Sequence, residues 1–473
     1  MLDKLLLFGA TGDLAGRFLL PALAELQANK AIPDTFRVLG TAPQPLTDEE
    51  FRLHAAKRLA EFAKDVPETA RESLLGRLRY CPVELGVDHV TGALQALLGV
   101  PSDGADARPA IAAYLAVPPR LFVPAVTALG EAGLPAGSRI VVEKPFGESL
   151  EHARALNRLL IAVTSRSRDS AVFRVDHVLG MATVHNLLGL RLANRVLEPL
   201  WNGIHIARIE ILWEETIALE GRAGYYDRTG ALKDVLQNHM LQILSLVAME
   251  PPLSLSERDL RDRKVDALRS VRTPSLEQVA SRTRRARYMA GRLAGTGGAA
   301  NRDVPAYVRE QGVDPTRGTE TFAEIVLELD SWRWAGTQFV LRAGKALSQR
   351  RKGVIVHFRP APHLPFGRDV LPPKSNELRI GLDGPETLSL HLTGSAPGPP
   401  PQLKELALTT ELPATELRAY SQVLLDVLEG DCTLSIRGDE AEESWRIVMP
   451  VLGAWAEGLV PLEEYAAGST GPL

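Results

Sequence analysis

The sequence predicts an α/β domain with a parallel, doubly wound sheet, followed by an α+β domain with a large antiparallel sheet. Apolar strand-like stretches alternate with helical patterns over the first part of the chain, which is typical of a parallel sheet covered by helices. Strand-like stretches follow one another without helices over residues 323–392, which is typical of an antiparallel sheet. We therefore expect two domains, residues 1–176 and residues 177–473.

The composition is that of a soluble globular protein with more than one core. The chain has 473 residues, of which 45% are hydrophobic and 24% are charged. A net charge of -4 gives no reason to expect nucleic acid or a membrane as a partner, and no apolar run reaches the ~18 residues of a membrane span. Cys81 and Cys432 are too few for a disulfide scaffold, and the N-terminus lacks the arrangement of a signal peptide. We therefore expect a cytoplasmic protein.

A glycine-containing turn at the start of the chain indicates that the first domain is Rossmann-like and binds a dinucleotide. The apolar stretch Lys4–Phe8 predicts a strand, and a helical pattern follows the turn. Gly9 permits a tight turn, Gly12 lets the backbone approach a pyrophosphate, and Ala15 lets the helix pack closely. The helix N-terminus then offers N–H groups to the phosphates. The expected cofactor-binding residues of this turn are Gly9, Ala10, Thr11, Gly12, Asp13 and Leu14.

The end of the second expected strand, Phe36–Leu39, leaves the choice of cofactor open. An acidic residue at this place binds the ribose hydroxyl of NAD, and an arginine accommodates the 2′-phosphate of NADP. This chain continues as Gly40-Thr41-Ala42-Pro43-Gln44, which provides neither. The expected cofactor is therefore NADP or NAD.

Two later strand ends carry polar side chains. The strand Arg139–Glu143 runs into Lys144 and Pro145, a proline that can form a cis bond, and the strand at residues 171–175 runs into Asp176 and His177. Ligands of a doubly wound sheet bind at the carboxyl ends of its strands, so we interpret Lys144 as a binding residue.

Periodicity and breaker residues predict the remaining elements. Helical patterns cover residues 48–78, 121–132, 149–163, 183–200 and 420–429, and further strands are expected at residues 110–116, 206–213, 323–329, 338–341, 354–358, 377–382 and 387–392. We expect a loop at residues 394–401 and a charged stretch at residues 257–272. Residues 281–302 are rich in arginine and glycine but have little aromatic interleaving, so we expect a solvated loop there and no nucleic-acid site.

Residues 224–252 contain a predicted long amphipathic helix around His239. Apolar residues recur at the spacing of one buried helical face, and His239 lies on that face. Asp227 or Thr229 can cap the start of the helix, and Pro251 and Pro252 stop it. A buried imidazole that titrates near neutrality suits a proton acceptor, and a hydrogen-bonded core histidine would give the same pattern.

Together these stretches resemble the glucose-6-phosphate dehydrogenase family over nearly the whole chain. The segments that carry the resemblance are FGATGDLAGR at Phe8–Arg17, YLAVPPRLF at Tyr114–Phe122, VVEKPFG at Val141–Gly147, FRVDHVLG at Phe173–Gly180, LWEETIALEGRAGYYDRTGALKDVLQNHMLQ at Leu212–Gln242, WRWAG and LRAGKAL within Trp332–Leu347, and YAAGSTGP at Tyr465–Pro472.

The resemblance implies hydride transfer from C1 of an aldopyranose, by default glucose 6-phosphate, to NAD(P)+, which gives the lactone. His239 is then expected to be the general base, with Asp176 holding the imidazole and stabilising its charged form. The residues implied for substrate binding are Lys144, Glu215, Asp234 and Lys345 for sugar hydroxyls, and His177 and Arg350 near the phosphate. Lys144 is expected to contact the cofactor as well. We expect a small-molecule sugar or sugar-phosphate substrate, no metal, and a homodimer or homotetramer.

The chain departs from the family pattern at several binding positions. The family motif DHYLGK reads DHVLGM here, so that Val178 and Met181 replace a phosphate-binding tyrosine and lysine. Phe18 stands where the family has a lysine, Pro43 where it has the arginine that favours NADP, and Asp383 where it has a substrate-side glutamine.

These departures leave three hypotheses. Hydrogen bonds to charged groups contribute roughly 1.5–3 kcal/mol each, so the loss of two would weaken phosphate binding at least about a hundredfold. Either Arg350, Arg351 or Lys352 refills the phosphate site, or the substrate is an unphosphorylated or modified hexose. A non-catalytic sensing or assisting relative is the third hypothesis, and the retained Asp176 and His239 count against it.

Overall fold

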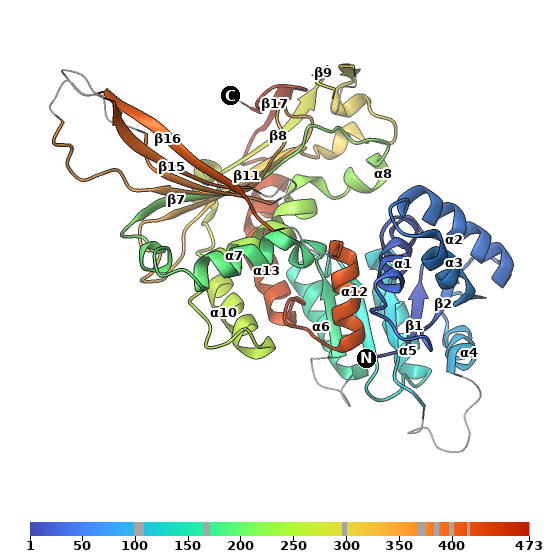
Figure 1. Ribbon diagram of the computed structural model, residues 1–473. Helices are drawn as coiled ribbons and strands as arrows, with labels where there is room; N and C mark the ends of the chain where they lie inside the picture. Colours follow the sequence, from blue (N-terminus) through green and yellow to red (C-terminus); the bar gives the residue numbers. More distant parts are fainter. Residues whose placement is uncertain are drawn as a thin grey trace. The chain divides into compact units, whose positions relative to one another are not determined.

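The computed structural model describes residues 1–98, 108–164, 171–295, 300–366, 374–382, 387–396, 402–413 and 417–472 (Figure 1). The chain forms two compact units. Unit 1 consists of Met1–Met181, Leu253–Arg261 and Thr415–Glu442, and unit 2 consists of Ala182–Pro252, Asp262–Ala414 and Glu443–Leu473. The predicted domain boundary after residue 176 stays a prediction.

Unit 1 contains a parallel sheet of six strands within the described residues, in the order β3-β2-β1-β4-β5-β6. Every pairing in this sheet is parallel. Consecutive strands are therefore connected by segments that cross over the sheet and not by tight turns. The predicted Rossmann-like arrangement is therefore confirmed. The strands are β1 Lys4–Phe8, β2 Arg37–Ala42, β3 Leu78–Pro82, β4 Ala112–Leu115, β5 Arg139–Glu143 and β6 Val172–Val175.

The helices of unit 1 interrupt these strands in the expected alternation. The helical pattern at residues 48–78 resolves into α2 and α3, with Pro67 at the N-cap of α3, and its last residue already belongs to β3. The elements are η1 Ala15–Leu19, α1 Leu20–Ala28, α2 Asp48–Phe62, α3 Glu68–Gly76, α4 Val87–Leu98, η3 Pro119–Leu121, α5 Phe122–Glu131, α6 Leu150–Thr164, η5 His177–Gly180 and α12 Ala419–Glu429.

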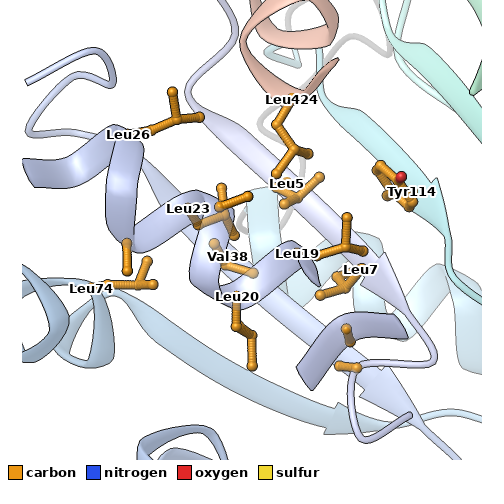
Figure 2. Close-up of a cluster of buried hydrophobic side chains, with 14 of the residues drawn as sticks. Leu5, Leu7, Leu19, Leu20, Leu23, Leu26, Val38, Leu74, Tyr114 and Leu424 are labelled. Carbon is orange, nitrogen blue, oxygen red and sulfur yellow. The ribbon is translucent and has the colours of Figure 1, made fainter. Parts of the chain in front are cut away.

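A late segment of the chain completes the core of unit 1. Figure 2 shows Leu424 of α12 in the same buried cluster as Leu5, Leu23 and other apolar side chains of β1 and α1. Arg139 at the start of β5 donates from Nη1 to the carbonyl oxygens of Val427 (2.6 Å) and Leu428 (2.8 Å). These bonds satisfy carbonyl groups at the C-terminal end of α12, which would otherwise have no partner within the helix.

Unit 2 contains a sheet of nine strands within the described residues, in the order β16-β15-β14-β13-β7-β12-β11-β8-β17. Most pairings are antiparallel, as predicted, but β7 with β12 and β8 with β17 are parallel. The strands are β7 Ile206–Glu214, β8 Thr283–Met289, β11 Phe322–Leu327, β12 Gln338–Gly344, β13 Arg351–Phe358, β14 Glu377–Gly381, β15 Thr387–Ala396, β16 Gln402–Glu411 and β17 Leu462–Ala466. The predicted α+β class of this part is confirmed.

Helices of unit 2 contact this sheet, and one of them, η7, carries His239. The predicted helix consists of the π-helical η7 and α9, and the residues before its expected cap form the short helix α8. The η7 segment contacts β7, β11 and β12. The helices are α7 Ala182–Leu192, η6 Glu198–Leu200, α8 Ala223–Tyr226, η7 Leu232–Met240, α9 Leu241–Ala248 and α11 Leu276–Arg282; α10 Glu257–Ser270 and α13 Gly438–Ala456 contribute residues to both units.

The predicted solvated loop at residues 281–302 is wrong. Residues 283–289 form β8, followed by a small hairpin of β9 Gly291–Leu293 and β10 Arg302–Val304. Two of the three arginines of β8 bind acidic side chains of β17, Arg284 with Glu463 and Arg287 with Glu464, and Arg285 donates to the carbonyl oxygen of Val460. Composition alone missed this strand, in which Thr283, Ala286 and Tyr288 are buried and the arginines between them are half-buried.

Two local predictions also need correction. Neither Asp227 nor Thr229 caps the helix of His239. Instead, Oε1 of Glu320 accepts a hydrogen bond from the Leu232 amide at 2.9 Å. The Asp227 carboxylate is committed elsewhere, because it binds Tyr307 and Arg317. The loop predicted at residues 394–401 is wrong for residues 394–396, which belong to β15, and residues 397–401 lie outside the described residues.

None of the helices in the described part of the chain has the length and apolar character needed to cross a membrane.

Candidate active site

The glycine turn after β1 has the geometry that close approach to a dinucleotide requires. Gly9 has φ +75°, and a Cβ at this position would lie 2.2 Å from the carbonyl oxygen of Ala116. The amides of Gly9 and Ala10 both donate to the carbonyl oxygen of Thr41, and the Gly12 amide donates back to Gly9. Only glycine fits at position 9, and the helix that follows begins at Asp13, directly after the turn.

Side chains tie this turn to the second strand and to α2. The Thr11 hydroxyl donates to Oε1 of Gln44 (3.0 Å), and Arg58 of α2 binds the Asp13 carboxylate (3.0 Å). Pro43 and Gln44 follow β2, so this strand end still offers neither an acid nor an arginine. The turn fits a bound dinucleotide, and the choice between NAD and NADP stays open.

Lys144 and Asp176 come from neighbouring strand ends in unit 1. The last residue pair of β5 and β6 is Glu143 with Val175, so that Lys144 and Asp176 follow directly. The bond between Lys144 and Pro145 is cis. Asp176 is 2% exposed, and its Oδ1 accepts a hydrogen bond from the Val178 amide at the start of η5.

Glu143 is a buried acid at this strand end that sequence reasoning did not identify. The Tyr114 hydroxyl donates to its Oε1 at 2.5 Å. Burial raises the pKa of Glu143 to about 7, the nearby Asp176 acts in the same direction, and the bond from Tyr114 acts against it. The available signal was a carboxylate that ends the otherwise apolar strand IVVE.

The apolar departures from the family pattern lie around His177. Its imidazole stacks on the Tyr420 ring of α12 (5.5 Å between centroids, 18° between planes), and Phe18 lies against the same tyrosine at 5.1 Å. Val178 is 1% exposed and therefore packs as a core residue, while Met181 is half-buried. These three apolar side chains provide no charge for a phosphate.

His239 is buried in unit 2, as its helical face predicted. It is 3% exposed, and its ring stacks on Trp213 of β7 with centroids 5.3 Å apart and planes 25° apart. Its amide donates to Oδ1 of Asn238 at 2.7 Å. Asp234 lies on the first turn of the same π-helical segment, half-buried, where its charge adds to burial in raising the pKa of Tyr225.

Glu215 lies directly after β7 and is held by two lysines. Lys345 Nζ is 2.6 Å from Oε2, and Lys352 Nζ is 3.1 Å from Oε1. Burial would raise the pKa of Glu215, but the two ammonium groups outweigh it and lower the pKa to about 2. Arg350, which was predicted to lie near the phosphate, precedes β13 and is exposed. The sequence named Lys352 only as one of three residues that could refill the phosphate site, and not as a partner of Glu215.

Unit 1 contains the glycine turn, Lys144, Asp176 and His177, of which Lys144 and Asp176 follow neighbouring strands. Unit 2 contains Glu215, Asp234, His239 and Lys345, of which Glu215 and Lys345 form an ion pair. The predicted pairing of Asp176 with His239 joins residues of different units and stays a prediction. Asp383 lies outside the described residues.

Comparison with known proteins identifies the family. Residues 6–186 match the family model "Glucose-6-phosphate dehydrogenase, NAD binding domain", and residues 188–473 match "Glucose-6-phosphate dehydrogenase, C-terminal domain". The chain belongs to the glucose-6-phosphate dehydrogenase family. It is an enzyme of this type, an oxidoreductase that uses NAD or NADP, as the sequence predicted.

Several relatives match over almost the full length. The glucose-6-phosphate 1-dehydrogenases of Zymomonas mobilis and Treponema pallidum are 37% and 36% identical, over 99% of this chain and 96% and 92% of theirs. A crystal structure of the Mycobacterium avium enzyme is 33% identical, with a TM-score of 0.84 over 99% of this chain and 95% of that one. A glucose-6-phosphate dehydrogenase in complex with glucose 6-phosphate is 28% identical, also with a TM-score of 0.84, over 100% and 96%.

Proposed function

We propose that this family member oxidises glucose 6-phosphate at C1, with His239 as the general base. The observation that carries the proposal is the buried imidazole of His239, stacked on Trp213 and presented by the same unit as the lysine-bound carboxylate of Glu215. A buried, oriented imidazole is suited to accept a proton near neutral pH. The relative solved with glucose 6-phosphate supports the choice of substrate.

The reaction removes a proton from the oxygen of the C1 hydroxyl and a hydride from C1 itself. The C1 hydroxyl gives its proton to His239, the C–O bond becomes a carbonyl, and C1 loses its hydrogen together with the bonding electrons, which yields the lactone. When bound at the glycine turn, the nicotinamide cofactor supplies the hydride acceptor. Asp176 is proposed to hold the imidazole in the tautomer that accepts the proton and to stabilise its charged form.

The remaining site residues are proposed to bind the two ligands. The turn formed by Gly9–Leu14 would hold the pyrophosphate, and Lys144 would contact both cofactor and sugar. Glu215, Asp234 and Lys345 would bind sugar hydroxyls, because a carboxylate and an ammonium group provide both acceptors and donors. The residues proposed for the 6-phosphate are His177 and Arg350.

An unphosphorylated or modified hexose is the second candidate substrate. It is favoured by Val178 and Met181, two apolar residues at positions where the resemblance predicts a phosphate-binding tyrosine and lysine. Phe18 is a third apolar departure, where the family has a lysine near the glycine turn. Both candidates share the same chemistry at C1. A cytoplasmic location and a homodimer or homotetramer remain predictions.

Steady-state kinetics with glucose and glucose 6-phosphate, each with NAD and NADP, test the proposal. We expect kcat/KM to be at least about a hundredfold higher for glucose 6-phosphate, which corresponds to about 2.7 kcal/mol of differential binding. Equal values for the two sugars would favour the second candidate. The absence of turnover with every combination, in a protein that still binds the cofactor, would favour a non-catalytic relative.

A further inference from the structure

Trp213 and Lys352 form a cross-strand pair beside His239, and the proposed function assigns neither of them a role. The two residues are direct partners in the antiparallel register of β7 and β13, so their side chains are neighbours on one face of the sheet. The Lys352 ammonium lies 4.3 Å from the centroid of the Trp213 ring. A cation at this distance is attracted to the electron-rich face of an indole.

The pair lies between two residues of the proposed site. Lys352 Nζ is 3.1 Å from Oε1 of Glu215, and the Trp213 ring stacks on the imidazole of His239. Contacts therefore run without a break from Glu215 through Lys352 and Trp213 to His239, all within unit 2. Trp213 is 7% exposed and the Lys352 side chain 11%, so water screens these contacts weakly.

The arrangement gives the ammonium group of Lys352 two partners, the Glu215 carboxylate and the Trp213 ring. An ammonium group held by Glu215 alone could rotate about its flexible stem, whereas the indole face gives it a second, fixed partner. In return, two contacts fix the plane of the Trp213 indole. One is with the Lys352 ammonium group and the other is the stack on the His239 imidazole. The imidazole then has one preferred orientation relative to β7.

We propose that Trp213, held by Lys352, is a positioning residue that fixes the ring plane of His239 for proton abstraction. This inference rests on the proposed function, because it requires His239 to be the base. Neither Trp213 nor Lys352 needs to touch the reacting atoms. A base that is displaced by about 1 Å or rotated can lose up to about a hundredfold in rate without any loss of substrate affinity.

Kinetics of Trp213→Leu and Trp213→Phe, compared with wild type and His239→Asn, test this role. For Trp213→Leu we expect kcat to fall by about tenfold or more while the KM for the sugar changes less than about threefold. Trp213→Phe keeps an aromatic face and should recover most of kcat. Deuterium at C1 of the sugar should slow Trp213→Leu more than wild type, because proton abstraction with hydride transfer then limits turnover.

A double variant separates positioning from general damage. If Trp213 acts through His239, Trp213→Leu should cause no further loss in a His239→Asn background. Trp334→Phe is the matched control, because Trp334 is a buried indole of the same unit that packs on Phe339 and donates to the Ala248 carbonyl. We expect this control to lower Tm and leave kcat unchanged.

Lys352→Met and Lys352→Arg decide the matter if Trp213→Leu does not fold. Methionine keeps the length of the side chain but removes the charge, so kcat should fall severalfold, and arginine should restore it because it can stack on the indole and bind Glu215. The inference is overturned if His239→Asn is inactive while Trp213→Leu or Lys352→Met keeps kcat within twofold of wild type. If His239→Asn itself retains turnover, the proposed function fails first.

Discussion

Glu143, which is buried, and Glu215, which is half-buried, are carboxyl groups at strand ends whose surroundings move their pKa values in opposite directions. Glu215 faces two ammonium groups, and its pKa falls to about 2 although burial acts against this. Glu143 faces Asp176 and has a tyrosine hydroxyl as its partner, and burial raises its pKa to about 7. The two lysine ammonium groups therefore determine the pKa of Glu215, and desolvation determines the pKa of Glu143.

Glu215→Gln should destabilise the protein at neutral pH but not in acid. The folded pKa of about 2 lies below the ordinary 4.5, so the ionised group stabilises the fold above pH 4.5, and this contribution is lost as the pH falls towards 2. We expect the variant to be less stable at pH 7 by roughly 2–4 kcal/mol, with a gap that narrows below pH 4.5. Urea unfolding at several pH values measures this gap, with Glu457→Gln, an exposed site in the same unit, as the control.

Glu143→Gln should show the opposite pH dependence. The folded pKa of about 7 lies above 4.5, so between these values the folded state holds a proton that the unfolded state has released. Wild type should therefore lose roughly 2–4 kcal/mol of stability between pH 4.5 and pH 7.5 that the variant does not lose. Unfolding free energies that change in parallel for the two proteins would contradict the raised pKa.

At the scale of elements, the π-helical segment that carries His239 starts against a residue far away in the sequence. The Glu320 carboxylate accepts a hydrogen bond from the Leu232 amide. The same carboxylate lies so close to Gly230 that a Cβ on residue 230 would be 2.4 Å from Oε1 of Glu320. Gly230 also has φ +67°, which disfavours any other residue. The position of η7 therefore depends on this contact with the end of a loop before β11.

Gly230→Ala tests this dependence against Gly221→Ala. Both glycines have positive φ, +67° and +77°, but a Cβ at Gly221 would meet nothing within 4 Å. Both variants should show backbone strain, and Gly230→Ala should lose at least about 1 kcal/mol more because Glu320 must move. Thermal unfolding of the two variants measures the difference, and equal losses would show that the contact does not hold η7.

Local patterns predicted the elements whose signals lie within a few residues. The glycine turn, the strand before it and the buried face of His239 all follow from nearest-neighbour spacing, and the structure confirms them. The contacts of Glu320 with Leu232 and of Lys352 with Trp213 depend on strand register between residues far apart in the sequence. No short-range pattern contains that information, so the cap and the positioning pair were missed.

At the scale of the whole molecule, a late segment supports the first unit. Helix α12 belongs to unit 1, where its apolar residues fill the core beside β1 and its last carbonyl groups bind Arg139. The sequence predicted a helix there but not its place, because an amphipathic face does not specify which apolar surface covers it. The same limit left β8 unpredicted in an arginine-rich stretch, because its partner strand β17 also lies far along the chain.

The family assignment and the two units lead to one chemical claim, which is that the imidazole of His239 removes the proton from the C1 hydroxyl. The most direct measurement is kcat for His239→Asn with glucose 6-phosphate, followed by the absorbance of the reduced nicotinamide, in a variant whose cofactor binding and Tm match wild type. The account predicts a loss of at least about a hundredfold, the usual contribution of a positioned general base. A kcat within about tenfold of wild type would contradict it.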